Sequence, residues 1–328
     1  MKSEQYLLQI LTDSLTRNFS DFPDRILVAL SGGVDSMALV LTAKKWCERC
    51  NILLKSVTID HKLRSDSDQE AKKVAEVMQS NNIDHQIITW YDGDKLSSNI
   101  EAKAREARYE LLIDYAKEHN ISVIVTAHHQ DDQIETFFMR LLRGSGIDGL
   151  AAMKEKKKLT DHITLWRPFL NITKQDLKEY LLSRQQTWFE DDSNENIMFL
   201  RNNVRQLLYK IADKELIDKR IIQTINHFDR AKDFLEKYTE EIFSKFVQQE
   251  KEQLIIEVEK FKNLHQEIAL RLLIRIFKDI NGGYNKPRFK NLFNLYQKII
   301  NNQINKSTTF SSTIIAIKND KIIFKSEM

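Results

Sequence analysis

The chain of 328 residues contains only 8 glycines, 3 prolines and 2 cysteines. So few glycines and prolines predict long helices and few elaborate loops. Two cysteines, Cys47 and Cys50, are too few for a disulfide framework in a chain of this length. No run approaches the roughly 18 uncharged apolar residues of a membrane span, and Glu4 stands where a signal peptide needs an apolar stretch. We therefore expect a cytoplasmic protein that does not enter a membrane.

Length and pattern together predict two domains, because a single core usually stops growing at about 250 to 300 residues. From about Asp213 onward, the alternation of strands and helices gives way to charged helical patterns that continue to about residue 299, with Gly282-Gly283 interrupting them. We expect a catalytic domain over residues 1–212 and an accessory domain over residues 213–328. The net charge of +3 does not indicate a partner by itself, so a nucleic-acid surface must come from local clusters.

Short apolar runs of strand type alternate with helical periodicity in the first part of the chain. These runs lie at residues 25–30, 51–60, 84–91 and 121–127. The alternation predicts an α/β fold with a doubly wound, Rossmann-like parallel sheet and a ligand site at the carboxyl ends of its strands. The tail at 312–325 consists of two alternating runs around Asn319-Asp320. The accessory domain is thus predicted to be mainly helical with a terminal β-hairpin.

The most informative short stretch is "SGGVDS", which follows the first predicted strand and precedes a helical pattern. Unpaired amides and the helix dipole at such a turn favour a bound anion, with phosphate as the natural ligand. The stretch lacks the Gly-Lys-Ser/Thr ending of a Walker A loop and the three-glycine spacing of a dinucleotide fingerprint. A plain surface turn is the alternative, but the two glycines directly follow an apolar strand.

The pattern S-G-G-x-D-S resembles the pyrophosphate loop of the ATP pyrophosphatase (PP-loop) superfamily. Members of that superfamily adenylate a carbonyl-type oxygen and release pyrophosphate. The resemblance implies an ATP site formed by Ser31, Gly32, Gly33, Val34, Asp35 and Ser36. It also implies that Asp35 is a catalytic residue and a ligand of Mg²⁺, since a hard cation takes carboxylate and phosphate oxygens together.

Four further stretches narrow the resemblance. They are "TIDHKLR" (58–64), "NIEAKAREARYELL" (99–112), "TAHHQDDQIETFFMRLLRGSG" (126–146) and "DDSNENIMFLRNNVR" (191–205). Together they resemble the tRNA(Ile)-lysidine synthase family, and the likeness covers most of residues 25–205. It implies that ATP adenylates the wobble cytidine of tRNA(Ile). Free L-lysine then displaces AMP through its ε-amine and gives lysidine at carbon 2.

A lysine site needs acids for the ammonium groups and an arginine for the carboxylate. Asp132 and Glu135 lie three residues apart, hence on one face of a helix that starts near Asp131. The resemblance implies that these two carboxylates are catalytic and bind lysine, together with Arg108 and Arg201. For Asp131 we prefer the simpler role of complementing a helix N-terminus.

The same family likeness assigns residues at two other strand ends. His128 is expected to be catalytic near the ATP phosphates, where a donor offsets developing charge. Asp60 and His61 are expected to contact the nucleotide for topological reasons. A zinc site at His128 and His129 is disfavoured, because adjacent histidines point in different directions.

Basic residues gather between residues 271 and 298, which hold seven Lys or Arg and one acid. We expect Lys286, Arg288 and Lys290 to contact tRNA phosphates, while a solvated helix face is the competing interpretation. The run "KEKKK" at 154–158 is a second candidate, or else a plain surface run. The chain resembles a short form of the family with a single accessory domain. A homodimer stays an open alternative.

Rival functions come from the same superfamily and from outside it. A tRNA thiolase or a small-molecule amidating synthetase shares the loop, and a non-catalytic RNA-binding protein could retain the fold. Cys47 and Cys50 lie at the end of the predicted helix that follows the loop, about four turns from the loop at about 1.5 Å per residue. At that distance, a role in helix packing is a better interpretation of the two cysteines than sulfur transfer.

Overall fold

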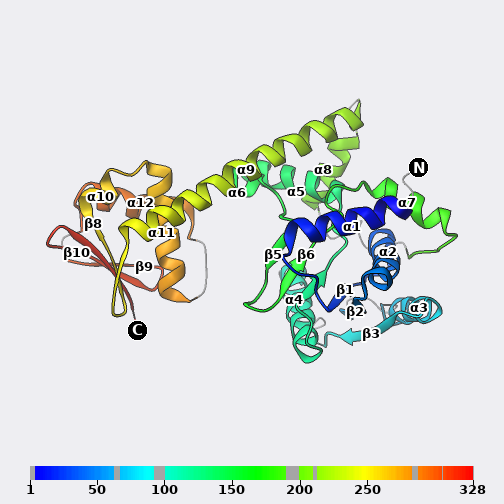
Figure 1. Ribbon diagram of the computed structural model, residues 1–328. Helices are drawn as coiled ribbons and strands as arrows, with labels where there is room; N and C mark the ends of the chain where they lie inside the picture. Colours follow the sequence, from blue (N-terminus) through cyan, green and yellow to red (C-terminus); the bar gives the residue numbers. More distant parts are fainter. Residues whose placement is uncertain are drawn as a thin grey trace. The chain divides into compact units, whose positions relative to one another are not determined.

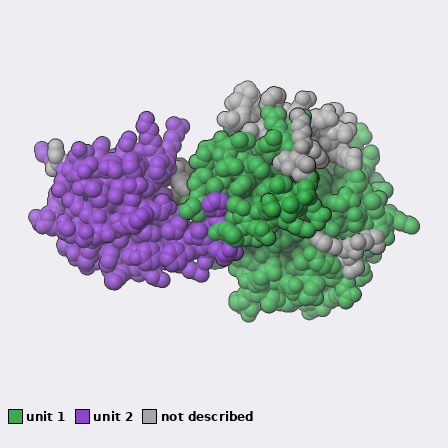
Figure 2. Space-filling view, turned by 90° about the horizontal axis from the view of Figure 1, so that it is seen from above, with its two compact units in different colours: residues 1–227 green, residues 228–328 purple. Residues whose placement is uncertain are grey.

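The computed structural model describes residues 4–62, 67–91, 100–189, 199–209, 213–282, 287–304 and 306–327. The chain forms two compact units, residues 1–227 and 228–328, which Figure 2 colours separately. We call them the first and second units. The division falls inside one helix, α9 (Lys214–Phe246). The domain boundary between residues 212 and 213 stays a prediction.

The first unit is built on a six-stranded sheet with the order β3-β2-β1-β4-β6-β5. Its strands are β1 (Arg25–Ala29), β2 (Leu53–Asp60), β3 (Asp84–Thr89), β4 (Val123–Val125), β5 (Lys156–Lys158) and β6 (Thr164–Trp166). All neighbours run parallel except β5 and β6. The predicted parallel sheet is confirmed. The last two strands escaped prediction because each has three residues and β5 consists of lysines alone.

Helices cover both faces of this sheet (Figure 1). Before α9, the helices of this unit are α1 (Glu4–Asn18), α2 (Val34–Cys50), α3 (Ser67–Ser80), α4 (Ile100–Glu118), α5 (Gln130–Leu142), α6 (Ile147–Leu150), α7 (Lys174–Ser183) and α8 (Phe199–Tyr209). Side chains alternate along β1, so Ile26 and Val28 pack with α1, α2 and α7 while Leu27 packs with α4. Burial on both faces explains the continuous apolar run at residues 26–28.

The strand order places a topological switch point at β1. This strand pairs with β2 on one side, where Ile26 faces Leu54, and with β4 on the other, where Ile26 faces Val123. The chain leaves β1 towards β2 and leaves β4 towards β6, so the connections after β1 and β4 diverge. In open α/β sheets, the crevice at such a point binds the ligand.

The second unit contains a five-stranded antiparallel sheet with the order β7-β8-β11-β10-β9. Its strands are β7 (Gln248–Glu250), β8 (Gln253–Glu257), β9 (Thr308–Phe310), β10 (Thr313–Lys318) and β11 (Lys321–Ser326). The end of α9, α10 (Val258–Lys262), α11 (Gln266–Asn281) and α12 (Phe289–Ile300) supply apolar side chains that share one core with the sheet.

The predicted terminal hairpin is confirmed as β10 and β11, with Asn319 and Asp320 both at positive φ as a tight hairpin turn requires. The sequence predicted helices up to about residue 299 with an interruption at Gly282-Gly283 alone, and this was wrong, because β7 and β8 also interrupt them around Lys251 at φ 55°. The strands β7 and β8 have three and five residues, which are too few for an alternating pattern to be recognised in the sequence. Within the described residues, no helix has the length and apolar character of a membrane span. The cytoplasmic location stays a prediction.

Candidate active site

The Ser31–Ser36 loop joins β1 to the N-terminus of α2, as the strand-turn-helix pattern predicts. Gly32 has φ +85°, and a Cβ there would lie 2.6 Å from Val74 Cγ2. Only glycine fits this position. Gly33 is the N-cap of α2, and no side chain caps it. The first backbone N–H groups of α2 are therefore available to donate hydrogen bonds to a bound anion.

Ser36 holds the shape of this loop. Its hydroxyl accepts a hydrogen bond from the Ser31 N–H at 3.1 Å, lies 3.1 Å from Ser31 Oγ and donates to the Gly33 carbonyl at 3.1 Å. Val34 is buried in the core beneath the loop. These two side chains support the backbone around the phosphate position, and their direct contact with ATP stays a prediction.

The connection after β4 meets the loop through His129. This buried side chain places Nε2 3.3 Å from Asp35 Oδ2, and Nδ1 lies 3.5 Å from Asp131 Oδ2. Burial alone lowers the pKa of His129, but Asp131 and Asp35 together raise it to about 10. The two carboxylates thus favour the protonated form of the ring. The switch point therefore places a buried histidine, held between two aspartates, beside the glycine loop.

The structure brings His129, and not the predicted His128, against Asp35. His128 Nδ1 instead lies 2.9 Å from Thr126 Oγ1 at the end of β4. The sequence signal located the histidine pair, but neighbouring residues of an extended segment point to opposite sides. Which of the two faces the loop depends on the sheet register, which the sequence does not reveal. The catalytic role of His128 stays a prediction.

Asp35 lies in the first turn of α2 and fits a cation ligand. Its Oδ1 is buried and has no hydrogen-bond partner among the described residues, while Oδ2 faces His129. A buried carboxylate oxygen without a partner suits a metal ion. In the described ranges, no group of three or more His, Cys, Asp or Glu could hold a metal. The binding of Mg²⁺ at Asp35 stays a prediction.

The two aspartates in the first turn of α5 make different contacts. Asp132 Oδ2 accepts the His129 N–H at 3.1 Å and so caps the helix. Asp131 Oδ2 instead accepts the Lys174 N–H at 3.0 Å, and Oδ1 lies 3.7 Å from Lys214 Nζ. Although burial opposes it, the nearby His129 ring and the hydrogen bond from the Lys174 N–H hold the pKa of Asp131 well below its usual value.

Glu135 is buried and forms a bidentate ion pair with Arg205 of α8. Arg205 Nε donates to Oε1 at 2.5 Å and Nη2 donates to Oε2 at 3.3 Å. Sequence reasoning missed Arg205, although it follows Arg201 by one helical turn in "RNNVR". The side chain of Arg201 lies outside the described residues. Arg205 is thus the described arginine next to the predicted lysine site.

Arg108 belongs to α4, and its described hydrogen bond is with His61, which follows the end of β2. Its Nε donates to His61 Nε2 at 3.3 Å, and burial and this guanidinium lower the pKa of His61 to about 4. Asp60 is buried next to it, accepts the Lys62 N–H at 3.0 Å and lies 3.3 Å from Lys62 Nζ. Because β2 adjoins β1, this neutral histidine and paired aspartate line the same edge of the sheet.

The predicted tRNA contacts belong to the second unit. Arg288 and Lys290 are exposed at the start of α12, whereas Lys286 lies outside the described residues. Arg271 pairs with Glu267 and Arg275 with Glu240 and Asp279, so both are neutralised. The 154–158 run contributes the edge strand β5, in which Lys156 Nζ donates to the Asn18 carbonyl and Lys158 pairs with Asp161.

Comparison with known proteins decides the family. A family described as a PP-loop domain matches residues 2–212. A tRNA(Ile)-lysidine synthase from Wolbachia pipientis wMel is 32% identical over 318 residues, covering 96% of this chain and 74% of that protein. One from Ruegeria pomeroyi is 36% identical over 281 residues, covering 85% and 67%. The chain belongs to the tRNA(Ile)-lysidine synthase family. It is a ligase-type PP-loop enzyme that uses ATP.

A solved structure shares the fold of this tRNA(Ile)-lysidine synthase family member. A U34-tRNA thiolase from Methanococcus maripaludis, described with its [4Fe-4S] cluster, matches with a TM-score of 0.59 at 14% identity. The match covers 69% of this chain and 78% of the thiolase. The likeness supports the predicted α/β architecture of the first unit.

The cysteines do not suit sulfur chemistry. Cys47 is buried in the core, and burial raises its pKa to about 12. Cys50 is half-buried, and burial also raises its pKa. Both lie in the last turn of α2, about 20 to 25 Å from Gly33 at about 1.5 Å per residue. A thiolate is therefore disfavoured at either position.

Proposed function

We propose that this enzyme forms lysidine at the wobble cytidine of tRNA(Ile). ATP adenylates the cytidine carbonyl oxygen with release of pyrophosphate, and the ε-amine of free L-lysine then displaces AMP. The observation that carries the proposal is the cluster of side chains after the ends of β1 and β4. There the glycine loop, His129 and the acids of α5 come together.

The first half-reaction needs a site for pyrophosphate. The uncapped N-terminus of α2 offers backbone donors, and the buried His129 imidazolium offsets charge on the departing phosphates. Asp35 holds His129 through Oδ2 and presents Oδ1 to a cation. Mg²⁺, when bound there, supplies further charge neutralisation for the phosphates.

The second half-reaction needs a site for lysine. One carboxylate oxygen of Asp132 accepts the hydrogen bond from the His129 N–H, and the ion pair with Arg205 orients the carboxylate of Glu135. An ionised carboxylate has about four acceptor positions, so each can also accept a bond from an ammonium group. We propose that Asp132 and Glu135 bind the amines of lysine and that Arg108 and Arg201 bind its carboxylate.

The RNA part of the proposal concerns the second unit. The target cytidine must leave the anticodon stack to reach the crevice, while phosphate contacts fix the register of the tRNA. We propose Lys286, Arg288 and Lys290 for these contacts. A homodimer stays an untested prediction.

Incubation of the purified protein with ATP, labelled lysine and total tRNA tests the function directly. We expect label in RNA that depends on ATP and is lost in Asp35→Asn, which keeps the size of the side chain and removes its charge. Parallel reactions with labelled sulfide and labelled ammonium test the two rival activities, those of a tRNA thiolase and of an amidating synthetase. Incorporation of sulfur or ammonia in place of lysine contradicts the proposal.

A further inference from the structure

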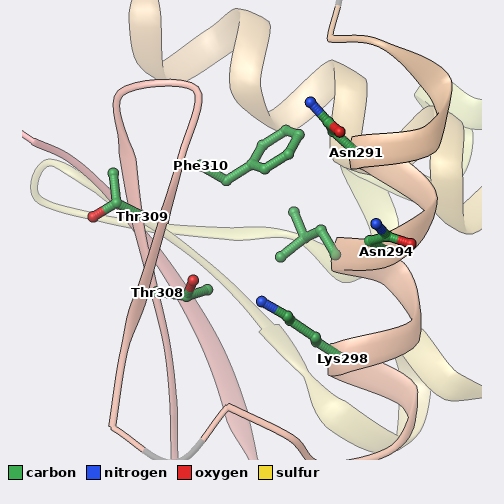
Figure 3. Close-up of a pocket in the computed structure, with 7 residues that line it drawn as sticks. Asn291, Asn294, Lys298, Thr308, Thr309 and Phe310 are labelled. Carbon is green, nitrogen blue, oxygen red and sulfur yellow. The ribbon is translucent and has the colours of Figure 1, made fainter.

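The second unit contains a polar groove that none of the predicted site residues explains. A pocket of ≈ 230 Å³ lies between α12 and β9. It is lined by Asn291, Asn294, Leu295, Lys298, Thr308, Thr309 and Phe310. Figure 3 shows Asn291, Asn294 and Lys298 along one side of α12, with the Lys298 ammonium directed into the groove. Their spacing of three and four residues puts them on one helix face.

In the part of the chain that the structure describes, the polar side chains of the groove have no side-chain partner. Among the described residues, neither the two asparagines nor Lys298, Thr308 or Thr309 makes a side-chain hydrogen bond or an ion pair. The arginines of the neighbouring helix α11 differ, because Arg271 and Arg275 are both paired with acids. The groove therefore presents two amides, two hydroxyls and an ammonium group to a ligand.

The sequence around the groove is free of acids. Residues 280–318 contain six Lys or Arg and no Asp or Glu, although the whole chain has 47 Asp and Glu. The net charge of the chain is only +3, so the rest of the chain is net negative. A segment this cationic within a mildly charged chain is complementary to a polyanion.

We propose that this groove binds the ribose-phosphate backbone of the RNA substrate. Lys298 takes a phosphate, and Asn291, Asn294 and Thr308 contact a neighbouring ribose. The 2′-hydroxyl both donates and accepts hydrogen bonds, and so do an amide and a hydroxyl side chain. The Phe310 ring packs on Phe277 with centroids 5.2 Å apart, which favours a backbone contact over base stacking. That the RNA is a tRNA rests on the proposed function.

The proposed contact between Lys298 and a phosphate is tested with Lys298→Gln in the full chain, by measuring tRNA affinity over a range of salt concentrations. Loss of one phosphate contact should reduce the slope of log affinity against log salt by about 0.7 to 0.9. The matched control is Lys251→Gln, which removes an exposed cation in the β7–β8 turn, at the opposite edge of the sheet from β9. An equal change in both variants indicates a general field effect and overturns the proposal.

The ribose contact is tested with Asn294→Ala, an exposed position whose change leaves the core intact. We expect weaker tRNA binding with an unchanged salt slope, because no charge is lost. Wild type should bind a DNA copy of the same sequence more weakly than the RNA, and Asn294→Ala should narrow that difference. An unaltered RNA preference in Asn294→Ala overturns the ribose contact.

The two proposals fail separately. If Lys298→Gln and Asn294→Ala bind tRNA as wild type does while labelled lysine still enters tRNA, the groove assignment is wrong and the function stands. If wild type transfers no lysine but Lys298→Gln still reduces the salt slope, the function is wrong and the groove stands.

Discussion

Gly32 shows how one residue fixes the glycine loop. Its φ of +85° and the 2.6 Å that would separate a Cβ from Val74 both oppose any side chain. We expect Gly32→Ala to lower the free energy of unfolding by about 1 to 3 kcal/mol and to weaken ATP binding. Thermal unfolding and nucleotide titration measure the two effects.

The neighbouring glycine provides a matched control. Gly33 has an ordinary φ of −73°, and the nearest atom to its Cβ position is Ser31 Oγ at 3.8 Å. Gly33→Ala should therefore unfold close to the wild-type temperature. Equal unfolding temperatures for Gly32→Ala and wild type would show that the loop accommodates a Cβ in either place.

Cys47 offers a prediction about reactivity. Its thiol is buried and its pKa is raised to about 12, so the thiolate fraction at pH 8 is negligible. Native protein should react with iodoacetamide more slowly at Cys47 than at the half-buried Cys50, and denatured protein should react at both. Peptide mass analysis after timed labelling measures this. Rapid native labelling of Cys47 contradicts the packing role.

The helices α5 and α8 are joined by the Arg205–Glu135 ion pair. We expect changes at this contact to affect the proposed lysine step and not the adenylation step. Arg205→Lys keeps the charge but loses the bidentate geometry, so Glu135 loses its orientation. Asp132→Asn removes a charge while its amide oxygen can still accept the His129 N–H. Loss of a charge-assisted bond corresponds to about 1.5 to 3 kcal/mol, or about 10- to 150-fold in lysine affinity.

We expect adenylated tRNA to accumulate in both variants and high lysine to restore product. Mass analysis of the RNA after a single turnover, at low and then high lysine, measures the intermediate. The Glu135→Gln variant is the paired control, since Arg205→Lys should add little to it if both act through one contact. Absence of the adenylate at any lysine concentration assigns these residues to the first step.

The elements that the sequence predicts are those whose pattern is local. The strand before Ser31 carries a continuous apolar run, and Asn319-Asp320 is a turn signal by itself, so both were found. The strands β5 and β7 have three residues each and no apolar side chain, so no pattern marks them. The strand β4 is equally short, but it lies in the longer apolar run at residues 121–127. The choice between His128 and His129, and the pairing of Arg205 with Glu135, depend on packing between segments far apart in the chain.

At the scale of the whole molecule, catalysis and RNA binding are predicted to separate between the units. Arg288 and Lys290 are exposed in the second unit, while the glycine loop belongs to the first. Replacing both cations with alanine should raise the KM for tRNA, reduce the salt slope by about 1.5, and leave kcat at saturating tRNA and ATP affinity unchanged. Steady-state kinetics and salt titration measure these quantities. An unchanged slope supports a merely solvated helix face.

The pairing of β1 with β4 also has a consequence for synthesis on the ribosome. The edge of β1 that receives β4 stays open until residues 123–125 have been translated. At about 5 to 20 residues per second, that delay lasts about 5 to 20 s after β1 emerges. An apolar strand with an open edge can pair with the wrong chain. The strand order that places the glycine loop at the switch point therefore leaves one edge of β1 exposed in the nascent chain. Until β4 has been synthesised, this edge can pair with the wrong strand.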